Sequence, residues 1–267
     1  MYNVHWKPSN ESNWRKPMSG HSKWSTIKRK KGAEDAKRAK IFTRLGRDIM
    51  IAAREGGGDE NANPKLKLAV MKAKGANMPK ENIERAIKKG TGEIEGAQYE
   101  ELTFEAYGLD GVAFIIEAMT DNKNRTLAEV KSTLNKLGGS LATSGSVSWQ
   151  FAQRGTITLG GTGLDFDEVF MAAAEAGADD VVEDEDGITV YTPREKLGTV
   201  EQALTEAGYT IEESEMVWEP KNETNLPVDR ALSNMKIMER LEELDDVQSV
   251  ASNLEITEEL SAAFETA

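Results

Sequence analysis

The sequence predicts an α+β protein in which a small N-terminal helical bundle is followed by two ferredoxin-like α/β domains, the last inserted into the middle one. Three observations lead to this prediction. Apolar residues recur at helical spacing as far as about residue 90, and at the two-residue spacing of strands from residue 99 onward. The segment 153–220 reads β-α-β-β-α-β, which is the ferredoxin-like order. One helix and one strand follow it, and these are the two elements that the preceding segment lacks.

Three helices are expected in the N-terminal unit. The first covers about residues 33–54 and is followed by three glycines, which suit a helix C-terminus because glycine adopts left-handed backbone angles without a Cβ clash. Asn63 and Pro64 then supply an N-cap and a proline at the first helical position. A third helix begins after Pro79 and ends near Gly90. The apolar stripes are narrow, so we expect a small bundle with a largely cationic surface.

Strand spacing begins at Tyr99. A half-buried strand is expected over 102–106, and an apolar, central strand over 112–120. The turn DNKN then leads to a helix that ends at the glycine pair 138–139. Alternating apolar residues over 147–151 indicate another strand. The resulting β-β-α-β order leaves one face of the sheet only partly covered.

The next segment supplies the β-α-β-β-α-β order. Asp165 begins a helix in the manner of a capping box, and the pair Asp186-Gly187 is a strong signal for a hairpin turn between two strands. After a proline-bounded connection come a helix at about 229–244 and a strand at about 247–254, which we expect to complete the first sheet. A separate C-terminal tail is the alternative. The expected boundaries are a flexible extension at 1–18, a basic helical domain at 19–97, an α/β domain made of 98–152 and 228–255, an inserted ferredoxin-like domain at 153–220, and a frayed tail at 256–267.

Positive charge is concentrated in the first third of the chain. Residues 1–96 hold 22 Lys and Arg against 11 Asp and Glu, whereas the remainder holds 11 against 35, in a chain whose formal net charge is −13. Asymmetry of this size indicates a polyanion partner for the basic part. A solvated helical face is the alternative, but the opposite sign of the surroundings and a tryptophan within the cluster favour nucleic acid. Three roles are open for the acidic remainder. Its negative charge would orient the basic part toward that partner, it would contact basic proteins, or it would serve solubility alone.

The candidate nucleic-acid-binding residues lie in two segments. In the stretch 21–47, Lys and Arg side chains would contact phosphates, and Trp24 would stack on an unpaired base. The loop DNKNRT at 121–126 stands where the amides of a helix N-terminus favour anions, although simple turn chemistry explains it equally well. The Gly- and Ser-rich stretch 138–149 allows close backbone approach, with the same alternative. The predicted site residues are His21, Lys23, Trp24, Lys28, Arg29, Lys30, Lys31, Lys37, Arg38, Lys40, Arg44, Arg47, Asn122, Lys123, Asn124 and Arg125.

Composition and motifs argue against an enzyme. The chain has no cysteine, which excludes disulfides, thiolate zinc sites and thiol nucleophiles, and neither His5 nor His21 has a recognisable orienting acid or nucleophile. The glycine-rich stretches match no phosphate-loop spacing, and the acidic run 183–187 fails the EF-hand pattern at its first position. We therefore expect no catalytic residues, no metal, no cofactor and no small-molecule substrate. No apolar run approaches the ~20 residues of a membrane span, so we expect a cytoplasmic protein without a membrane partner.

A resemblance to a known family rests on four long motifs. They are MSGHSKWSTIKRKKGAEDAKRAKIFTRLGRDIMIAAREGGGD at 18–59, NMPKENIERAIKKGTG at 77–92, YEELTFEAYGLDGVAFIIEAMTDNKNRT at 99–126 and GGSLATSGSVSW at 138–149. In order and spacing they closely resemble the YebC/PmpR family, which includes the mitochondrial translational activator of cytochrome oxidase subunit one. The resemblance implies three domains, a helical one and two mixed α/β domains. It also implies that the basic N-terminal motif and the DNKNRT loop carry the function.

Two functions are consistent with these observations. Members of the resembled family are commonly described as probable DNA-binding transcriptional regulators, and others act in translation on ribosomes, relieving stalls at proline-rich stretches. The residues themselves suit ribosomal RNA at least as well as duplex DNA, because no helix shows the Asn, Gln and Arg set of a base-reading helix. The first hypothesis is thus a DNA-binding transcriptional regulator. The alternative is a ribosome-associated translation factor that binds ribosomal RNA.

Overall fold

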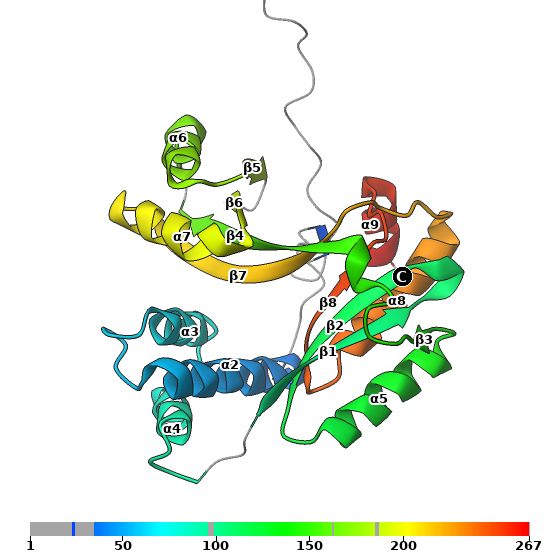
Figure 1. Ribbon diagram of the computed structural model, residues 1–267, viewed down its shortest axis with the longest axis horizontal. Coiled ribbons are helices and arrows are strands. Elements are labelled where there is room, and N and C mark those ends of the chain that lie inside the picture. The colour runs from blue at the N-terminus through cyan, green and yellow to red at the C-terminus, as the bar shows by residue number, and fades with distance from the viewer. Residues whose placement is uncertain (1–22, 25–34, 96–98, 162, 185–186, 267) are drawn as a thin grey trace, which may run out of the picture.

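The computed structural model describes residues 23–24, 35–95, 99–161, 163–184 and 187–266 (Figure 1). It confirms the predicted fold class: N-terminal helices are followed by two antiparallel sheets, each with helices against one face. Among the described helices, none is both long and apolar enough to cross a membrane.

The N-terminal unit consists of α2 (Asp35–Gly56), α3 (Pro64–Gly75) and α4 (Lys80–Gly90). The predicted N-cap is present: the Oδ1 atom of Asn63 accepts a hydrogen bond from the Leu66 amide at 3.1 Å, while its Nδ2 atom donates to the carbonyl of Ala52 at 2.7 Å. One buried amide therefore joins the end of α2 to the start of α3. The small core beneath these helices is built from Ile49, Ala52, Ala53, Leu66, Ala69, Val70, Ala73, Met78, Ile83 and Ala86.

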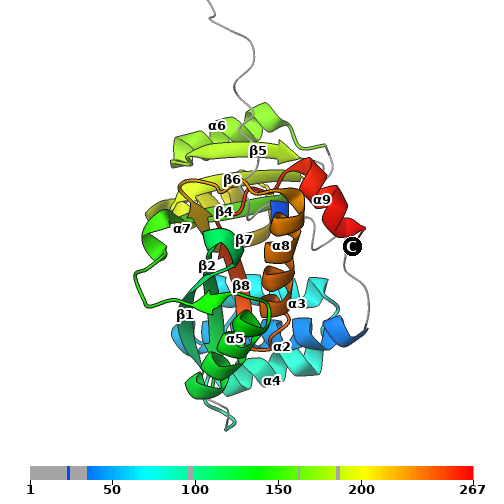
Figure 2. The same ribbon diagram turned by 90° about the vertical axis from the view of Figure 1, so that its right-hand side faces the viewer.

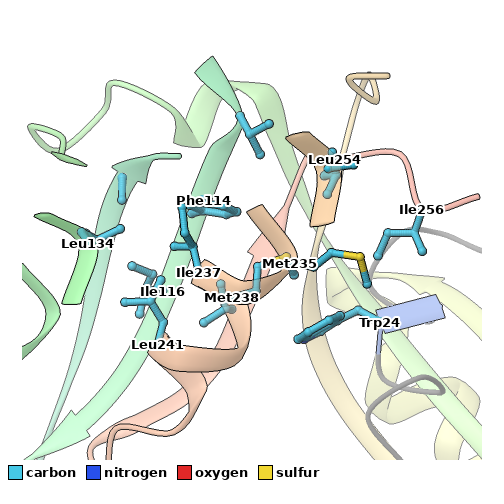
Figure 3. Close-up of a cluster of buried hydrophobic side chains, with 14 of the residues drawn as sticks. Trp24, Phe114, Ile116, Leu134, Met235, Ile237, Met238, Leu241, Leu254 and Ile256 are labelled. Carbon is cyan, nitrogen blue, oxygen red and sulfur yellow. The ribbon is translucent and has the colours of Figure 1, made fainter. Parts of the chain in front are cut away.

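The first sheet has the order β3-β1-β2-β8, and every pairing is antiparallel. Its strands are β1 (Glu100–Tyr107), β2 (Ala113–Thr120), β3 (Ser140–Leu141) and β8 (Val247–Ser252), with a 3₁₀ turn η1 (Leu109–Gly111) between β1 and β2. Helices α5 (Lys123–Lys136) and α8 (Val228–Glu242) pack on one face. Figure 3 shows Phe114 and Ile116 of β2 meeting Leu134 of α5 and Met238 of α8 in this core.

The second sheet has the order β5-β6-β4-β7, which is the ferredoxin-like arrangement for its four strands. In chain order the elements are β4 (Phe151–Gly160), α6 (Phe166–Ala176), β5 (Asp180–Asp184), β6 (Gly187–Pro193), a 3₁₀ turn η3 (Arg194–Lys196), α7 (Leu197–Glu206) and β7 (Thr210–Pro220). All of them lie, in sequence, between β3 and β8 of the first sheet. The second sheet is therefore formed by a segment that interrupts the first, and β8 after it pairs with β2, as expected for an inserted domain. The exact domain boundaries stay a prediction.

Two expectations from the sequence were wrong. The strand expected over 147–151 is instead a 3₁₀ turn, η2 (Ser148–Gln150), followed by β4, which belongs to the second sheet. β4 pairs with β7 along its length and with β6 over 154–159. The short β3 takes the place beside β1. The tail expected to fray forms helix α9 (Glu258–Glu265), capped by Thr257, whose Oγ1 atom accepts from the Leu260 amide at 3.2 Å. Leu260 and Phe264, four residues apart, are buried in the first core, and this packing stabilises a helix too short to be stable alone.

The helical unit lies beside both sheets. Figure 1 shows α3 running below β7, and Figure 2 shows α2 and α4 at the end of the first sheet opposite to α9. Lys72 of α3 forms an ion pair with Glu213 of β7 at 3.2 Å. The arrangement leaves α4 on the outside of the molecule, away from the second sheet.

Candidate nucleic-acid interface

The outer face of α4 carries three exposed cations. Arg85, Lys88 and Lys89 are spaced i, i+3 and i+4, so they share one side of the helix, while Ile83 and Ala86 face the core. None of the three cations forms an ion pair with a described residue, in contrast to Lys65, Lys74 and Lys80, which pair with Glu55, Glu60 and Glu84. We call Arg85, Lys88 and Lys89 the α4 triad.

A hollow of about 280 Å³ lies at the junction of α2 and α4, and two members of the triad line it. Arg85 and Lys89 form part of its wall, together with Asn82, Phe42 and Tyr99. The hollow combines two exposed cations, the buried Arg47, an amide and aromatic rings, and such groups contact phosphate, sugar and base in nucleic-acid interfaces.

Two arginines predicted to bind phosphate share one buried carboxylate instead. Arg47 of α2, 6% exposed, lies 2.9 Å from Oδ1 of Asp246, and Arg125 lies 2.7 Å from Oδ2. The hydroxyls of Thr120 and Thr126 donate to the same Oδ2 atom at 3.0 and 2.8 Å. Burial alone would raise the pKa of Asp246, but the hydrogen bonds from Arg125 and the two threonines and the charge of Arg47 outweigh it, so the pKa is lowered. Asp246 thus joins the helical unit to the first sheet.

Trp24 is a core residue in this structure. Its side chain is 3% exposed, its Nε1 atom donates to Oε1 of Glu242 at 3.1 Å, and its ring centroid lies 5.5 Å from that of Phe264 (Figure 3). In this position the indole cannot stack on a base. Lys23 and Arg44 are engaged in the same way, because they donate to the carbonyls of Ile256 and Glu242 at 2.9 and 2.5 Å. These three side chains attach the N-terminal segment to α8 and the residues around α9.

The DNKNRT loop begins α5. Asn122 is its N-cap, and its side chain accepts from the amide of Arg125 at 3.1 Å, as the turn-chemistry reading expected. Lys123 pairs with Glu100 at 2.5 Å, and Asn124 is exposed. The cap satisfies one helix-terminal donor, and Arg125 is already held by Asp246. The structure brings Arg125 and Arg47 together through that aspartate.

A buried carboxylate holds the Gly- and Ser-rich loop 142–149 in place. Glu105 of β1 is buried and accepts hydrogen bonds from the amides of Gly145, Val147 and Ser148 at 2.6, 2.6 and 3.0 Å. Gly145 has a φ of 86°, which disfavours other residues at this turn. Burial would raise the pKa of Glu105, but the three amide hydrogen bonds outweigh it and lower the pKa. The loop is therefore fixed by an ionised side chain.

Comparison with known proteins matches both parts of the chain to one family. The model described as the TACO1/YebC protein N-terminal domain matches residues 22–93, and the one described as the TACO1/YebC second and third domain matches residues 99–254. The chain belongs to the TACO1/YebC family. The predicted resemblance is thereby confirmed.

Curated members of the TACO1/YebC family align with nearly the full chain. A probable transcriptional regulatory protein of Trichlorobacter lovleyi is 52% identical over 240 residues, which cover 90% of this chain and 97% of the relative. A second, from Geobacter sulfurreducens, is 51% identical over 242 residues, covering 91% and 98%. Among solved structures, a conserved hypothetical protein of Aquifex aeolicus superposes with a TM-score of 0.76 at 44% identity, covering 84% of this chain and 93% of the other.

Several predicted site residues of this TACO1/YebC protein have no described side chain. His21, Lys28, Arg29, Lys30 and Lys31 lie outside the described residues, and the side chains of Lys37, Arg38 and Lys40 lie outside the described side chains. Sequence reasoning also missed two features. The α4 triad was readable in the motif ERAIKK, whereas Asp246 carried no signal, because an aspartate before a strand is ordinary in a sequence.

Glu105→Gln is expected to lower the free energy of unfolding by about 2 kcal/mol, since a carboxamide oxygen accepts less strongly and its NH₂ group meets the loop amides. Urea denaturation at pH 7 measures the loss. Because the folded pKa is below the unfolded one, the contribution of Glu105 is present above about pH 4.5 and is lost as the pH falls through the folded pKa. Exposed Glu129→Gln on α5 is the control and should change stability by less than about 0.5 kcal/mol.

Proposed function

We propose that this TACO1/YebC protein is a cytoplasmic, nucleic-acid-binding regulatory protein that acts on transcription by binding duplex DNA through its helical unit. The observation that carries the proposal is the α4 triad: three exposed, unpaired cations among the described residues, in a chain of net charge −13. The names of the bacterial relatives as probable transcriptional regulatory proteins support the same proposal.

The chemistry of the triad suits phosphates rather than bases. Lys and Arg on one side of an exposed helix can follow the DNA backbone, and such contacts position a protein on DNA without reading its sequence. The net charge of residues 97–267, which hold 11 Lys and Arg against 35 Asp and Glu, repels the duplex from the sheets. The helical unit is then the part of the protein that faces DNA. The cations at 28–31, which lie outside the described residues, are proposed to contribute to the same interaction on the basis of their charge.

The double variant Lys88→Gln/Lys89→Gln tests the proposal. Fluorescence anisotropy with a labelled duplex should show an affinity about 10-fold or more below wild type at 100 mM salt, and the log–log salt slope should fall by about 2 in magnitude, at about 0.9 per phosphate contact. The matched control is Lys65→Gln/Lys74→Gln, which removes the same charge from lysines already paired with glutamates. Equal losses in the two variants, or no loss in either, would contradict the assignment of the triad.

The same variant separates transcription from the alternative, a ribosome-associated factor that binds ribosomal RNA. Tagged protein is sedimented from lysate at low and high salt, and promoter occupancy is measured in parallel. We expect wild type to occupy promoter DNA and Lys88→Gln/Lys89→Gln to occupy it less. The other outcome is that wild type co-migrates with ribosomal subunits, the variant does not, and neither occupies promoter DNA. That result would contradict the transcription proposal and support the translation factor instead.

A further inference from the structure

Trp149 is the most exposed of the large apolar side chains among the described residues, at 67%. It lies in η2, at the end of the loop that Glu105 holds. Its indole Nε1 donates to the carbonyl of Ser146 at 2.9 Å, and its own carbonyl accepts from Nζ of Lys221 at 2.8 Å. The indole is therefore both exposed to solvent and fixed in orientation by hydrogen bonds at its ring nitrogen and its backbone.

Hydrogen bonds within the protein hold the loop around Trp149 in place. The Tyr107 hydroxyl donates to the carbonyl of Ser146 at 3.1 Å, and the hydroxyls of Thr143 and Ser146 are 2.7 Å apart. With its N–H group used inside the loop, the indole has only its ring left to offer. A rigid aromatic ring loses little conformational entropy when it stacks on a flat partner.

The loop carries no charge of its own that would repel a polyanion, and the ionised Glu105 that holds it is buried. Residues 137–150 include no charged side chain, although residues 97–267 as a whole are strongly acidic. The nearest cation by contact is Lys221, and Lys136 precedes the loop in sequence. Exposed Ser140 on β3 and exposed Thr143 and Ser144 in the same loop as Trp149 carry hydroxyls, which can hydrogen-bond to sugar and phosphate oxygens.

We propose that Trp149 is a stacking platform for an unpaired base of a single-stranded nucleic acid. This rests on the proposed function, to which it adds a second contact region and the kind of nucleic acid recognised there. Stacking on an aromatic side chain tolerates any base, since every base has a π-face, and the loop hydroxyls and Lys221 would contact the neighbouring sugar and phosphate. Melted DNA and RNA share this chemistry.

The test compares Trp149→Ala with wild type on labelled single-stranded 12-mers of DNA and of RNA. Loss of one base stack should weaken binding by about 10-fold or more, and Trp149→Phe should lose less. Quenching of tryptophan fluorescence on addition of the oligonucleotide should be reduced in Trp149→Phe. The control, Phe170→Ala, removes another exposed aromatic ring, on α6, and should bind like wild type. Unaltered thermal unfolding of Trp149→Ala would show that the loop is intact.

The outcomes distinguish this proposal from the function on which it rests. If Trp149→Ala binds both single strands as tightly as wild type while Lys88→Gln/Lys89→Gln still weakens duplex binding, the stacking proposal is wrong and the proposed function stands. If wild type binds neither duplex nor single strand in dilute buffer, the proposed function fails, and the stacking proposal fails with it. If Trp149→Ala loses affinity for RNA but not for DNA, or the reverse, the stacking proposal is supported. The oligonucleotide whose affinity falls is then the kind of nucleic acid that Trp149 binds.

Discussion

Replacing Asp246 by alanine is expected to lower the free energy of unfolding by about 3 to 5 kcal/mol, because it leaves a buried cation without its counter-charge. Arg47 is almost fully buried and lies 2.9 Å from the carboxylate, and its remaining hydrogen bonds go to the carbonyls of Asp245 and Met119. Two threonine hydroxyls lose their acceptor at the same time. Each loss adds a desolvation cost that the folded protein cannot recover.

Urea denaturation at pH 7 measures this loss, and two further variants define its cause. Asp246→Asn keeps the shape of the side chain and one acceptor oxygen but removes the charge, so it should cost less than alanine. Asp121→Asn removes the exposed partner of Arg125, whose ion pair at 3.0 Å is open to solvent, and should cost less than about 1 kcal/mol. A loss below about 1 kcal/mol for Asp246→Ala would mean that Arg47 finds water or another partner, and that the network does not hold the helical unit to the sheet.

Much of the fold was predictable because its signals are local. Asn63-Pro64 and the glycines after α2 mark helix ends, and the alternation over 102–106 and 112–120 marks the β1–β2 hairpin. The two errors concern elements whose identity is decided by long-range contacts. The pairing of Phe151 with Pro220 assigns β4 to the second sheet, and the fit of Phe264 against Trp24 makes a helix of the C-terminal residues. Neither contact has a local signature.

The candidate site was less predictable for a related reason. A count of Lys and Arg finds where positive charge is concentrated, but it cannot separate a cation that stays in water from one that joins domains. Arg44 and Arg47 belong to the predicted cluster and nevertheless donate to the carbonyl of Glu242 in α8 and to the carboxylate of Asp246 before β8. The helical spacing of Arg85, Lys88 and Lys89 was present in the sequence, but only the structure shows that they form no ion pair with a described residue, unlike other exposed lysines of the helical unit.

A second large effect is expected at the cavity where the helical unit meets both sheets. This cavity, about 600 Å³, is lined by α2, α3, β1, β2, β7 and β8. Burial, and then repulsion from Glu213, raises the pKa of Glu215 to about 7, with opposition from Lys72. Burial likewise raises the pKa of Asp48 to about 6, against the charges of Lys72, Arg44 and Arg47. Glu117 and Glu101 add further negative charge to the same walls.

Glu215→Gln is therefore expected to raise the free energy of unfolding at pH 8 by about 2 kcal/mol and to leave it nearly unchanged at pH 4. A carboxyl whose folded pKa exceeds its unfolded one binds its proton more tightly when folded, so the wild type loses stability as the pH rises from about 4.5 through 7. The difference between the variant and wild type should grow over that same interval. Urea denaturation at half-unit steps from pH 4 to 8 measures it, with exposed Glu212→Gln as the control. A difference in unfolding free energy that does not change with pH would contradict this prediction. It would show that burial does not penalise the ionised form of Glu215, and that the Lys72–Glu213 ion pair is the electrostatic contact that matters between α3 and β7.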